Sequence, residues 1–198
     1  MKRVINTIAI ALVAVFISLQ TQAQVYTVDT QKSVLTWYGE KVSGDHWGLI
    51  NVQSGEFTIK DGKLVSGKFE IDMNSIVDKD LTDETWNAKL VGHLKSPDFF
   101  DVEKFPKATF EITKAVTFSG GVGTVKGNLT IKGKTNPVEF KATMHKTSED
   151  LKFYGLVIID RSKYDIKYGS GSFFENLGDK TIYDEFKVRL NIVSTEKK

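Results

Sequence analysis

The sequence contains no cysteine, so no disulfide bond stabilises the fold and no lipid is attached to an amino-terminal cysteine. Stability must therefore come from a buried apolar core, which a chain of this length can supply. No internal repeat and no low-complexity linker divides the sequence. These features favour one folded domain after removal of the amino-terminal segment.

The sequence also lacks a long apolar run, and its most pronounced apolar stretch is a short one near the amino terminus. Lys2 and Arg3 precede an apolar stretch over residues 4–19, and Thr21-Gln22-Ala23 places small residues at the two positions that a signal peptidase reads. The stretch is short for a membrane span, which needs about 20 apolar residues. We therefore predict a signal peptide over residues 1–23, cleaved after Ala23, and a periplasmic or secreted protein.

The remaining chain has no excess of either charge. Without Lys2 and Arg3 it carries 25 basic and 25 acidic residues. A surface of this kind lacks the one-signed potential that attracts nucleic acid or an anionic membrane. We predict a single domain over residues 24–198 and no nucleic-acid partner.

What the chain does have is alternation of apolar and polar residues, which indicates strands with one buried face. Phe69-Glu70-Ile71-Asp72-Met73 is a clear example, and Asp61-Gly62 is the strongest hairpin signal. Many such strands need a sandwich or a closed barrel, and closure removes exposed edges. We predict an all-β fold, a soluble antiparallel closed β-barrel of about eight strands.

One segment breaks this alternation. Between Thr82 and Leu94, the apolar residues Trp86, Leu90 and Leu94 recur every four positions, as on one face of a helix. Thr82 can cap the start of this helix, and Ser96-Pro97 ends it. We predict one short inserted α-helix near residues 82–94, lying across one mouth of the barrel.

Three runs of residues resemble the YceI-like family. They are His93–Pro106 (HLKSPDFFDVEKFP), Gly127–Gly133 with the following Thr135 and Pro137-Val138, and Asp160–Tyr164. The resemblance extends over nearly all of the chain after the signal peptide. It implies a lipocalin-like barrel whose interior pocket binds polyisoprenoids or other long-chain amphiphiles. Many relatives carry a His-Ser pair where this chain has Lys32-Ser33, so a head-group role of that histidine is not carried over.

The apolar strand faces have two interpretations. An eight-stranded barrel is the size at which the interior is either filled by side chains or holds one small ligand. The residues alone favour a filled core, whereas the family resemblance favours a cavity. A bound lipid tail would be stabilised by roughly 25 cal/mol per Å² removed from water. The candidate cavity residues are Trp37, Phe57, Phe69, Ile71, Phe110, Ile112, Leu129, Ile131, Phe140 and Ile158.

The barrel mouth has a second set of candidates. His93 and Lys95 could meet a polar or anionic head group there, although packing and hydrogen bonding are the simpler role for His93. The other mouth candidates are Phe99, Phe100, Asp160 and Arg161, and the last two also suit a structural ion pair or turn contact.

The other two histidines, His46 and His145, lack ligand spacing, and we expect them on the solvated surface.

Residues 168–179 form a long predicted loop that carries Phe173 and Phe174. Its Gly169-Ser170-Gly171-Ser172 run lacks the preceding strand, the Gly-Lys ending and the following helix of a phosphate-binding loop. We expect a lid, a transient membrane contact or simple packing over the barrel rim.

No nucleophile elbow, metal motif or cofactor fingerprint is present. The resemblance to the YceI-like family, together with the absence of these motifs, predicts a protein that carries or sequesters a polyisoprenoid or similar long-chain lipid, with no catalytic residues, no cofactor and no metal. One alternative is an enzyme acting on such a lipid, with His93 and Asp160 as its actors. A second is a small outer-membrane β-barrel, which would turn its apolar face outward. A homodimer is also left open.

Overall fold

The computed structural model describes residues 22–197. The predicted signal peptide lies outside the described residues, apart from Gln22 and Ala23. Within residues 22–197, no helix is long and apolar enough to cross a membrane. The elements are β1 (Gln24–Val28), β2 (Val34–Lys41), β3 (Gly44–Lys60), β4 (Lys63–Asp78), α1 (Glu84–Lys95), β5 (Lys107–Ile112), β6 (Val116–Thr117), β7 (Val122–Ile131), β8 (Lys134–Lys146), β9 (Leu151–Asp160), the short 3₁₀ helices η1 (Arg161–Tyr164) and η2 (Gly178–Lys180), and β10 (Glu185–Glu196).

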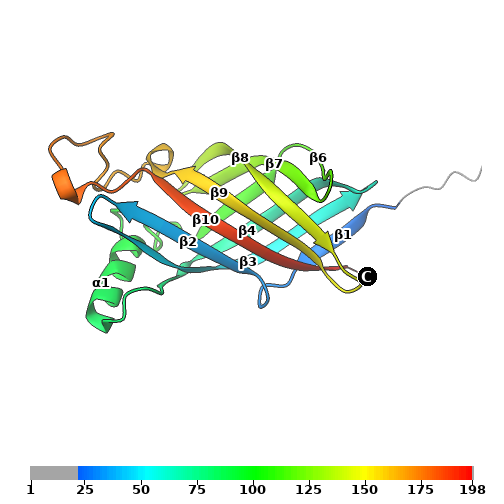
Figure 1. The fold of residues 1–198 in the computed structure, drawn as a ribbon, viewed down its shortest axis with the longest axis horizontal. Coiled ribbons are helices and arrows are strands. Elements are labelled where there is room, and N and C mark those ends of the chain that lie inside the picture. Colours follow the sequence, from blue (N-terminus) through cyan, green and yellow to red (C-terminus); the bar gives the residue numbers. More distant parts are fainter. Residues whose placement is uncertain (1–21, 198) are drawn as a thin grey trace, which may run out of the picture.

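The strands close into an antiparallel β-barrel (Figure 1). Eight of them follow one another around the wall in the order β3-β2-β10-β9-β8-β7-β5-β4, and β4 pairs with β3 to complete the circle. The two long strands β3 and β4 are joined at Asp61-Gly62, where both residues have positive φ. The predicted closed barrel and this predicted hairpin are confirmed.

The shortest strands extend the wall at one end of the barrel. β1 pairs with the carboxyl-terminal halves of both β3 and β10, while β2 pairs with the other halves of the same two strands. β1 and β2 therefore occupy one position in the wall, one after the other. β6 extends β5 in the same way, because both pair with β4.

Aromatic side chains fill the barrel at the β1 end. The rings of Tyr26 and Phe57 stack with 5.3 Å between their centroids, and Phe153 meets Phe57 edge-on at the same distance. Phe118 packs against Phe153 at 5.7 Å. Tyr26, Phe57 and Phe153 are buried. This end of the barrel is therefore a conventional packed core.

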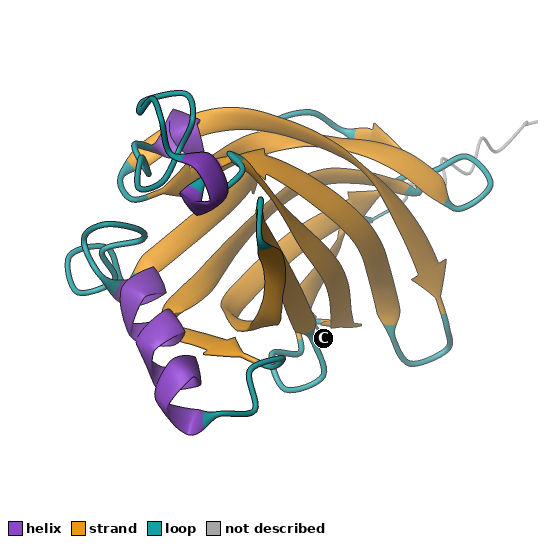
Figure 2. Cartoon of the chain, turned by 60° about the vertical axis from the view of Figure 1, so that its left-hand side comes forward, coloured by secondary structure: helices purple, strands orange, loops and turns teal. Residues whose placement is uncertain are grey.

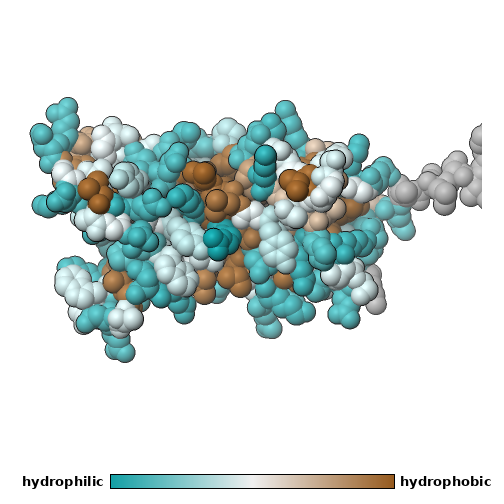
Figure 3. All heavy atoms as spheres, viewed as in Figure 1, coloured by the Kyte–Doolittle hydropathy of each residue, from teal (hydrophilic) through white to brown (hydrophobic). Residues whose placement is uncertain are grey.

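The outer face is largely polar. Ion pairs join neighbouring strands, as between Lys107 and Glu70 (2.8 Å) and between Lys126 and Glu139 (2.6 Å). Teal covers most of the face shown in Figure 3, although hydrophobic areas interrupt it. On β9, the exposed apolar side chains are Tyr154, Leu156 and Ile158.

Helix α1 lies beside the other end of the barrel (Figure 2). It begins one residue later than a Thr82 cap would require, because the Asp83 carboxylate accepts the N–H groups of Thr85 and Trp86. The expected apolar face is only partly realised. Trp86 is 59% exposed, whereas Leu90 and Leu94 face the barrel interior. The carboxyl-terminal half of the helix supplies these mouth residues, whereas the amino-terminal half is held to the end of β4 by hydrogen bonds from the Asn87 amide to Asp78 and Leu81.

Candidate ligand-binding site

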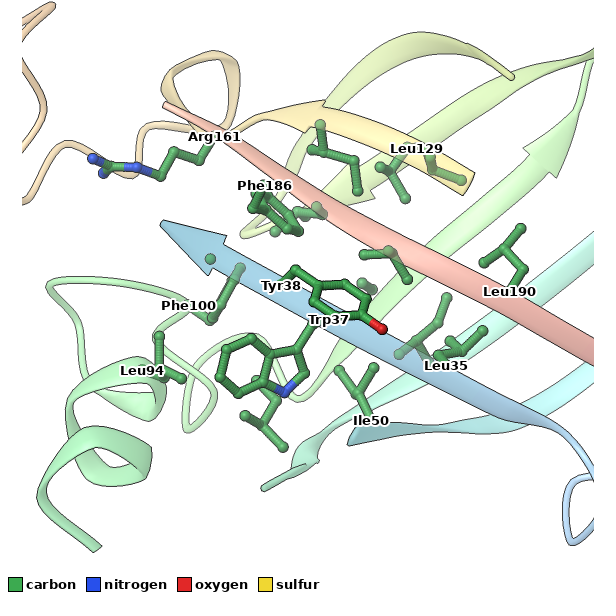
Figure 4. Close-up of a pocket in the computed structure, with 18 of the residues that line it drawn as sticks. Leu35, Trp37, Tyr38, Ile50, Leu94, Phe100, Leu129, Arg161, Phe186 and Leu190 are labelled. Carbon is green, nitrogen blue, oxygen red and sulfur yellow. The ribbon is translucent and has the colours of Figure 1, made fainter. Parts of the chain in front are cut away.

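The barrel encloses a cavity of about 670 Å³, open at the α1 end. The alternation of each strand turns one row of side chains into this space, and those side chains are apolar. In Figure 4, Leu35, Leu129 and Leu190 converge on it from three different strands. Cavities of a few hundred Å³ with apolar walls are typical of small-molecule sites.

Most of the sequence-predicted cavity residues line this space. They are Trp37, Phe57, Phe69, Ile71, Phe110, Ile112, Leu129, Ile131 and Phe140.

The placement of Ile158 was wrong. Its side chain is 53% exposed on the outer face of β9, and Val157 and Ile159 take the inward positions. Leu156-Val157-Ile158-Ile159 is a continuous apolar run, so alternation within it does not reveal which residues point inward. The inward phase of the strand is shown by Phe153, which lies four residues before Val157 and six before Ile159 and points inward as they do.

Several inward side chains are only half-buried although they belong to the barrel interior. Trp37, Phe69, Phe110 and Phe140 pack against the buried core but keep accessible surface. Val188 on β10, which lies opposite Trp37 on β2, does the same. Their accessible surface faces the cavity. The barrel is therefore filled at the β1 end and hollow between that core and the mouth.

Trp37 owes its position to a glycine on the neighbouring strand. Gly48 on β3 lies opposite it, and a Cβ at Gly48 would overlap both the Trp37 ring and the carbonyl oxygen of Val77. The missing side chain lets the indole lie across the strand, where its Nε1 donates a hydrogen bond to the Val77 carbonyl at 3.1 Å. A large aromatic ring is thus fixed in the cavity wall.

The mouth brings together four of the six predicted head-group candidates. His93, Phe99, Phe100 and Arg161 line the cavity, whereas Lys95 does not. The His93 ring lies 4.9 Å edge-on from Phe99 and 3.3 Å from the Asp98 carboxylate. His93 therefore presents a ring to the mouth that is already supported by packing and one polar partner.

Asp160, the sixth candidate, lies outside the cavity lining. Its carboxylate accepts hydrogen bonds from the backbone and the hydroxyl of Ser162 and so caps η1. This is the turn contact that we expected as one of its roles.

Arg161 is a structural residue as well as part of the lining. Its side chain is 4% exposed and donates to the carbonyl oxygens of Tyr183, Ile166 and Ile182 at 2.9–3.1 Å. Its charge partner is Asp184, at 3.4 Å. Burial lowers the pKa of this guanidinium, and the Asp184 charge opposes that effect. Arg161 holds the loop before β10 against η1 at the rim.

Sequence reasoning missed part of the rim. Tyr168 and Ile182 line the mouth, and the Tyr168 ring lies 4.5 Å from His93. Both belong to loops, where no periodicity shows which way a side chain points. Phe173 and Phe174 in the same long loop are exposed.

His145 is exposed as expected, but His46 is half-buried and its Nδ1 lies 2.8 Å from an Asp80 oxygen.

The polar members of the lining lie near the mouth. Those supplied by β2, β3 and the turn between them are Glu40, Lys41, Ser43 and His46, and those supplied by α1 and the loops before β10 are His93, Arg161, Asp179 and Lys180. The deeper wall is apolar. This arrangement suits a molecule with an apolar tail and a polar end.

Comparison with known proteins agrees with this architecture. The chain is 29% identical over 174 residues to the UPF0312 protein VPA0850 of Vibrio parahaemolyticus, covering 82% of this chain and 89% of that one. It superimposes on Burkholderia cenocepacia BcnA with a TM-score of 0.66 and 25% identity, over 85% of this chain and 99% of that one. A polyisoprenoid binding domain from Saccharophagus degradans gives a TM-score of 0.62 at 13% identity, over 87% and 98%. The model of the YceI-like domain matches residues 26–194, and the chain therefore belongs to the YceI-like family.

Proposed function

We propose that this protein binds the tail of a polyisoprenoid or similar long-chain amphiphilic lipid inside the barrel, and carries or sequesters that lipid outside the cytoplasm. The observation that carries the proposal is the cavity of about 670 Å³, whose deep wall is apolar and whose polar groups lie near the mouth. A tail inside and a head group at the rim would satisfy both regions.

The energetics need no charged group in the wall. Burying one CH₂ group contributes about 0.8 kcal/mol, so a tail of about fifteen carbons gains roughly 12 kcal/mol. Association itself costs about 4 kcal/mol or more in lost freedom. At this lowest association cost the difference is about 8 kcal/mol, which corresponds to roughly micromolar binding, whereas a tail of a few carbons would gain nothing. Chain length therefore becomes the main selectivity that this cavity supplies.

The comparison with known proteins supports the ligand class. The Saccharophagus degradans domain, which is described as polyisoprenoid binding, has the same fold over most of both chains. Membership of the YceI-like family also favours binding over catalysis.

The two alternatives have less support. An enzyme would need reacting groups beside the tail, yet the Asp160 carboxylate caps η1 and does not line the cavity. A lipid-facing barrel would need an apolar outer wall, whereas ion pairs such as Lys126–Glu139 lie on the outside here.

The experiment for this proposal is native mass spectrometry of the purified protein, followed by organic extraction of anything bound. The proposal predicts a discrete added mass that proves to be an isoprenoid or another long-chain lipid. Protein that is recovered bare, and that stays bare after incubation with geranylgeraniol and with longer prenyl alcohols, would contradict it.

Export is a separate part of the proposal. It rests on the charged, apolar and small-residue segments of residues 1–23. Cell fractionation with amino-terminal sequencing should recover a chain that begins at Gln24 outside the cytoplasm. A cytoplasmic chain that retains Lys2 and Arg3 would contradict it.

A further inference from the structure

Three potential metal ligands meet where β3 begins and β4 ends, beside α1. His46 lies on β3, Asp78 is the last residue of β4, and Asp80 follows it. One atom from each side chain lies within 4.8 Å of the other two. The His46 Nδ1 and an Asp80 oxygen are 2.8 Å apart. Two ligands of a tetrahedral Zn²⁺, each about 2.1 Å from the ion, lie about 3.4 Å apart, so this hydrogen-bonded pair would have to separate by only about 0.6 Å to hold the ion.

Each carboxylate has one oxygen held by the protein. The Oδ1 of Asp78 accepts from the Leu81 N–H at 2.9 Å and from the Asn87 amide at 3.0 Å. The Oδ1 of Asp80 accepts from the Trp47 N–H at 2.8 Å. Partners of this kind fix the orientation of metal ligands in proteins, because they hold the coordinating atom toward the ion.

Among residues 22–197, no N–H or hydroxyl donor pairs with the remaining oxygen of Asp78. Asp78 is only 5% exposed and its Oδ2 is buried, and the Asp78 carboxylate belongs to the cluster. Buried polar atoms are almost always paired, so this one calls for an explanation. Burial raises the pKa of Asp78, and the neighbouring Asp80 carboxylate adds to that rise. A cation placed between the two carboxylates and His46 would satisfy the unpaired oxygen and offset the repulsion.

We propose that His46, Asp78 and Asp80 bind a divalent transition-metal cation, with Zn²⁺ as the representative ion. One imidazole and two carboxylates form a mixed nitrogen and oxygen donor set, which suits Zn²⁺ and similar ions. Three protein ligands leave further coordination positions to water.

The cation would stabilise the barrel mouth. Asp78 already binds Asn87 of α1 through its Oδ1, and His46 also lines the cavity. Metal binding would therefore link β3, β4 and the start of α1 at the end of the barrel where α1 lies (Figure 1). The site borders the proposed lipid site, because His46 is also part of the mouth lining, but Asp78 and Asp80 lie outside that lining and no ligand comes from the apolar wall.

The test is calorimetric titration of ZnCl₂ into the tag-free chain without its signal peptide, after treatment with a chelator. Wild type should bind one Zn²⁺ saturably and unfold at a higher temperature with the metal present. Asp78→Asn keeps the shape of the side chain and should weaken Zn²⁺ binding by about 100-fold or more. His46→Gln should have the same effect and keeps the test valid if Asp78→Asn does not fold. His145→Gln, which removes an exposed histidine from β8, is the matched control and should bind as wild type does.

Two outcomes would overturn the proposal. One is the absence of saturable Zn²⁺ binding by wild type. The other is binding by both folded variants with the affinity of wild type. A proton shared by Asp78 and Asp80 in place of a metal would produce the first of these outcomes, together with an unfolding temperature that Zn²⁺ leaves unchanged.

Discussion

A larger side chain in the hollow part of the barrel should weaken lipid binding and stabilise the lipid-free protein. Val188→Phe is the informative substitution, because Val188 faces the cavity and is only half-buried. The phenyl ring adds four carbons. If they displace four carbons of the bound tail, the loss is about 3 kcal/mol, or roughly 100-fold in Kd. The same ring would contact Trp37 and Val157 across the strands and fill empty space, which should raise the free energy of unfolding by about 0.5–2 kcal/mol.

The assay needs two measurements on delipidated protein. Trp37 lies in the cavity wall, so its fluorescence should report titration with geranylgeraniol once the exposed Trp47 and Trp86 are replaced by Phe. Urea denaturation gives the stability. Val122→Phe makes the same change at an exposed position on β7 and should alter neither quantity. The reasoning is refuted if Val188→Phe lowers stability by about 1–3 kcal/mol, as overpacking a filled core does, and leaves geranylgeraniol binding unchanged.

Three further substitutions test the supports of the site by urea denaturation. Gly48→Ala should lower the free energy of unfolding by more than about 2 kcal/mol, because the new Cβ would overlap the Val77 carbonyl. At Gly39 a Cβ would meet open space, so Gly39→Ala should change the free energy of unfolding by no more than about 0.5 kcal/mol. Equal effects of the two substitutions would contradict this. Arg161→Met leaves the half-buried Asp184 carboxylate without its charge partner and three carbonyls without their donor, so it should lower the free energy of unfolding by about 3 kcal/mol or more, and a loss below about 1 kcal/mol would be the wrong result. Burial opposes ionisation of Asp184, but hydrogen bonds from Ser170 and Ser172 and the Arg161 charge lower its pKa below 3.8. Wild type should therefore exceed Asp184→Asn in free energy of unfolding by its largest margin above pH 3.8, and this margin should shrink as the pH falls through the lowered folded-state pKa. A margin that grows on acidification would contradict this.

The strands were predictable because alternation is a local property. Phe69 and Ile71 have polar neighbours on both sides, so their inward direction follows from the sequence alone. Ile158 lies in an apolar run where that signal is absent, and its outward direction depends on the phase of the whole strand. Whether the inward face enclosed a core or a cavity was not predictable from the residues, because both have the same pattern.

The features that were missed depend on contacts between distant segments. Helical spacing grouped Trp86 with Leu90 and Leu94, but only the latter two reach the mouth, so burial was set by where the barrel ends. His46 and Asp80 are 34 residues apart and meet because Gly48 pairs with Asp78 in the β3–β4 register. No spacing rule along the chain reveals a cluster formed by strand register.

The location of the bound tail is the central claim, and photo-crosslinking tests it most directly. A prenyl alcohol with a diazirine at the end of its tail would be bound to delipidated protein, irradiated and mapped by peptide mass spectrometry. We predict adducts on inward residues of the hollow region, such as Phe140 and Leu190, that unlabelled geranylgeraniol suppresses. Adducts confined to the exposed apolar residues Leu156 and Ile158 on the outer face of β9 would contradict a tail inside the barrel.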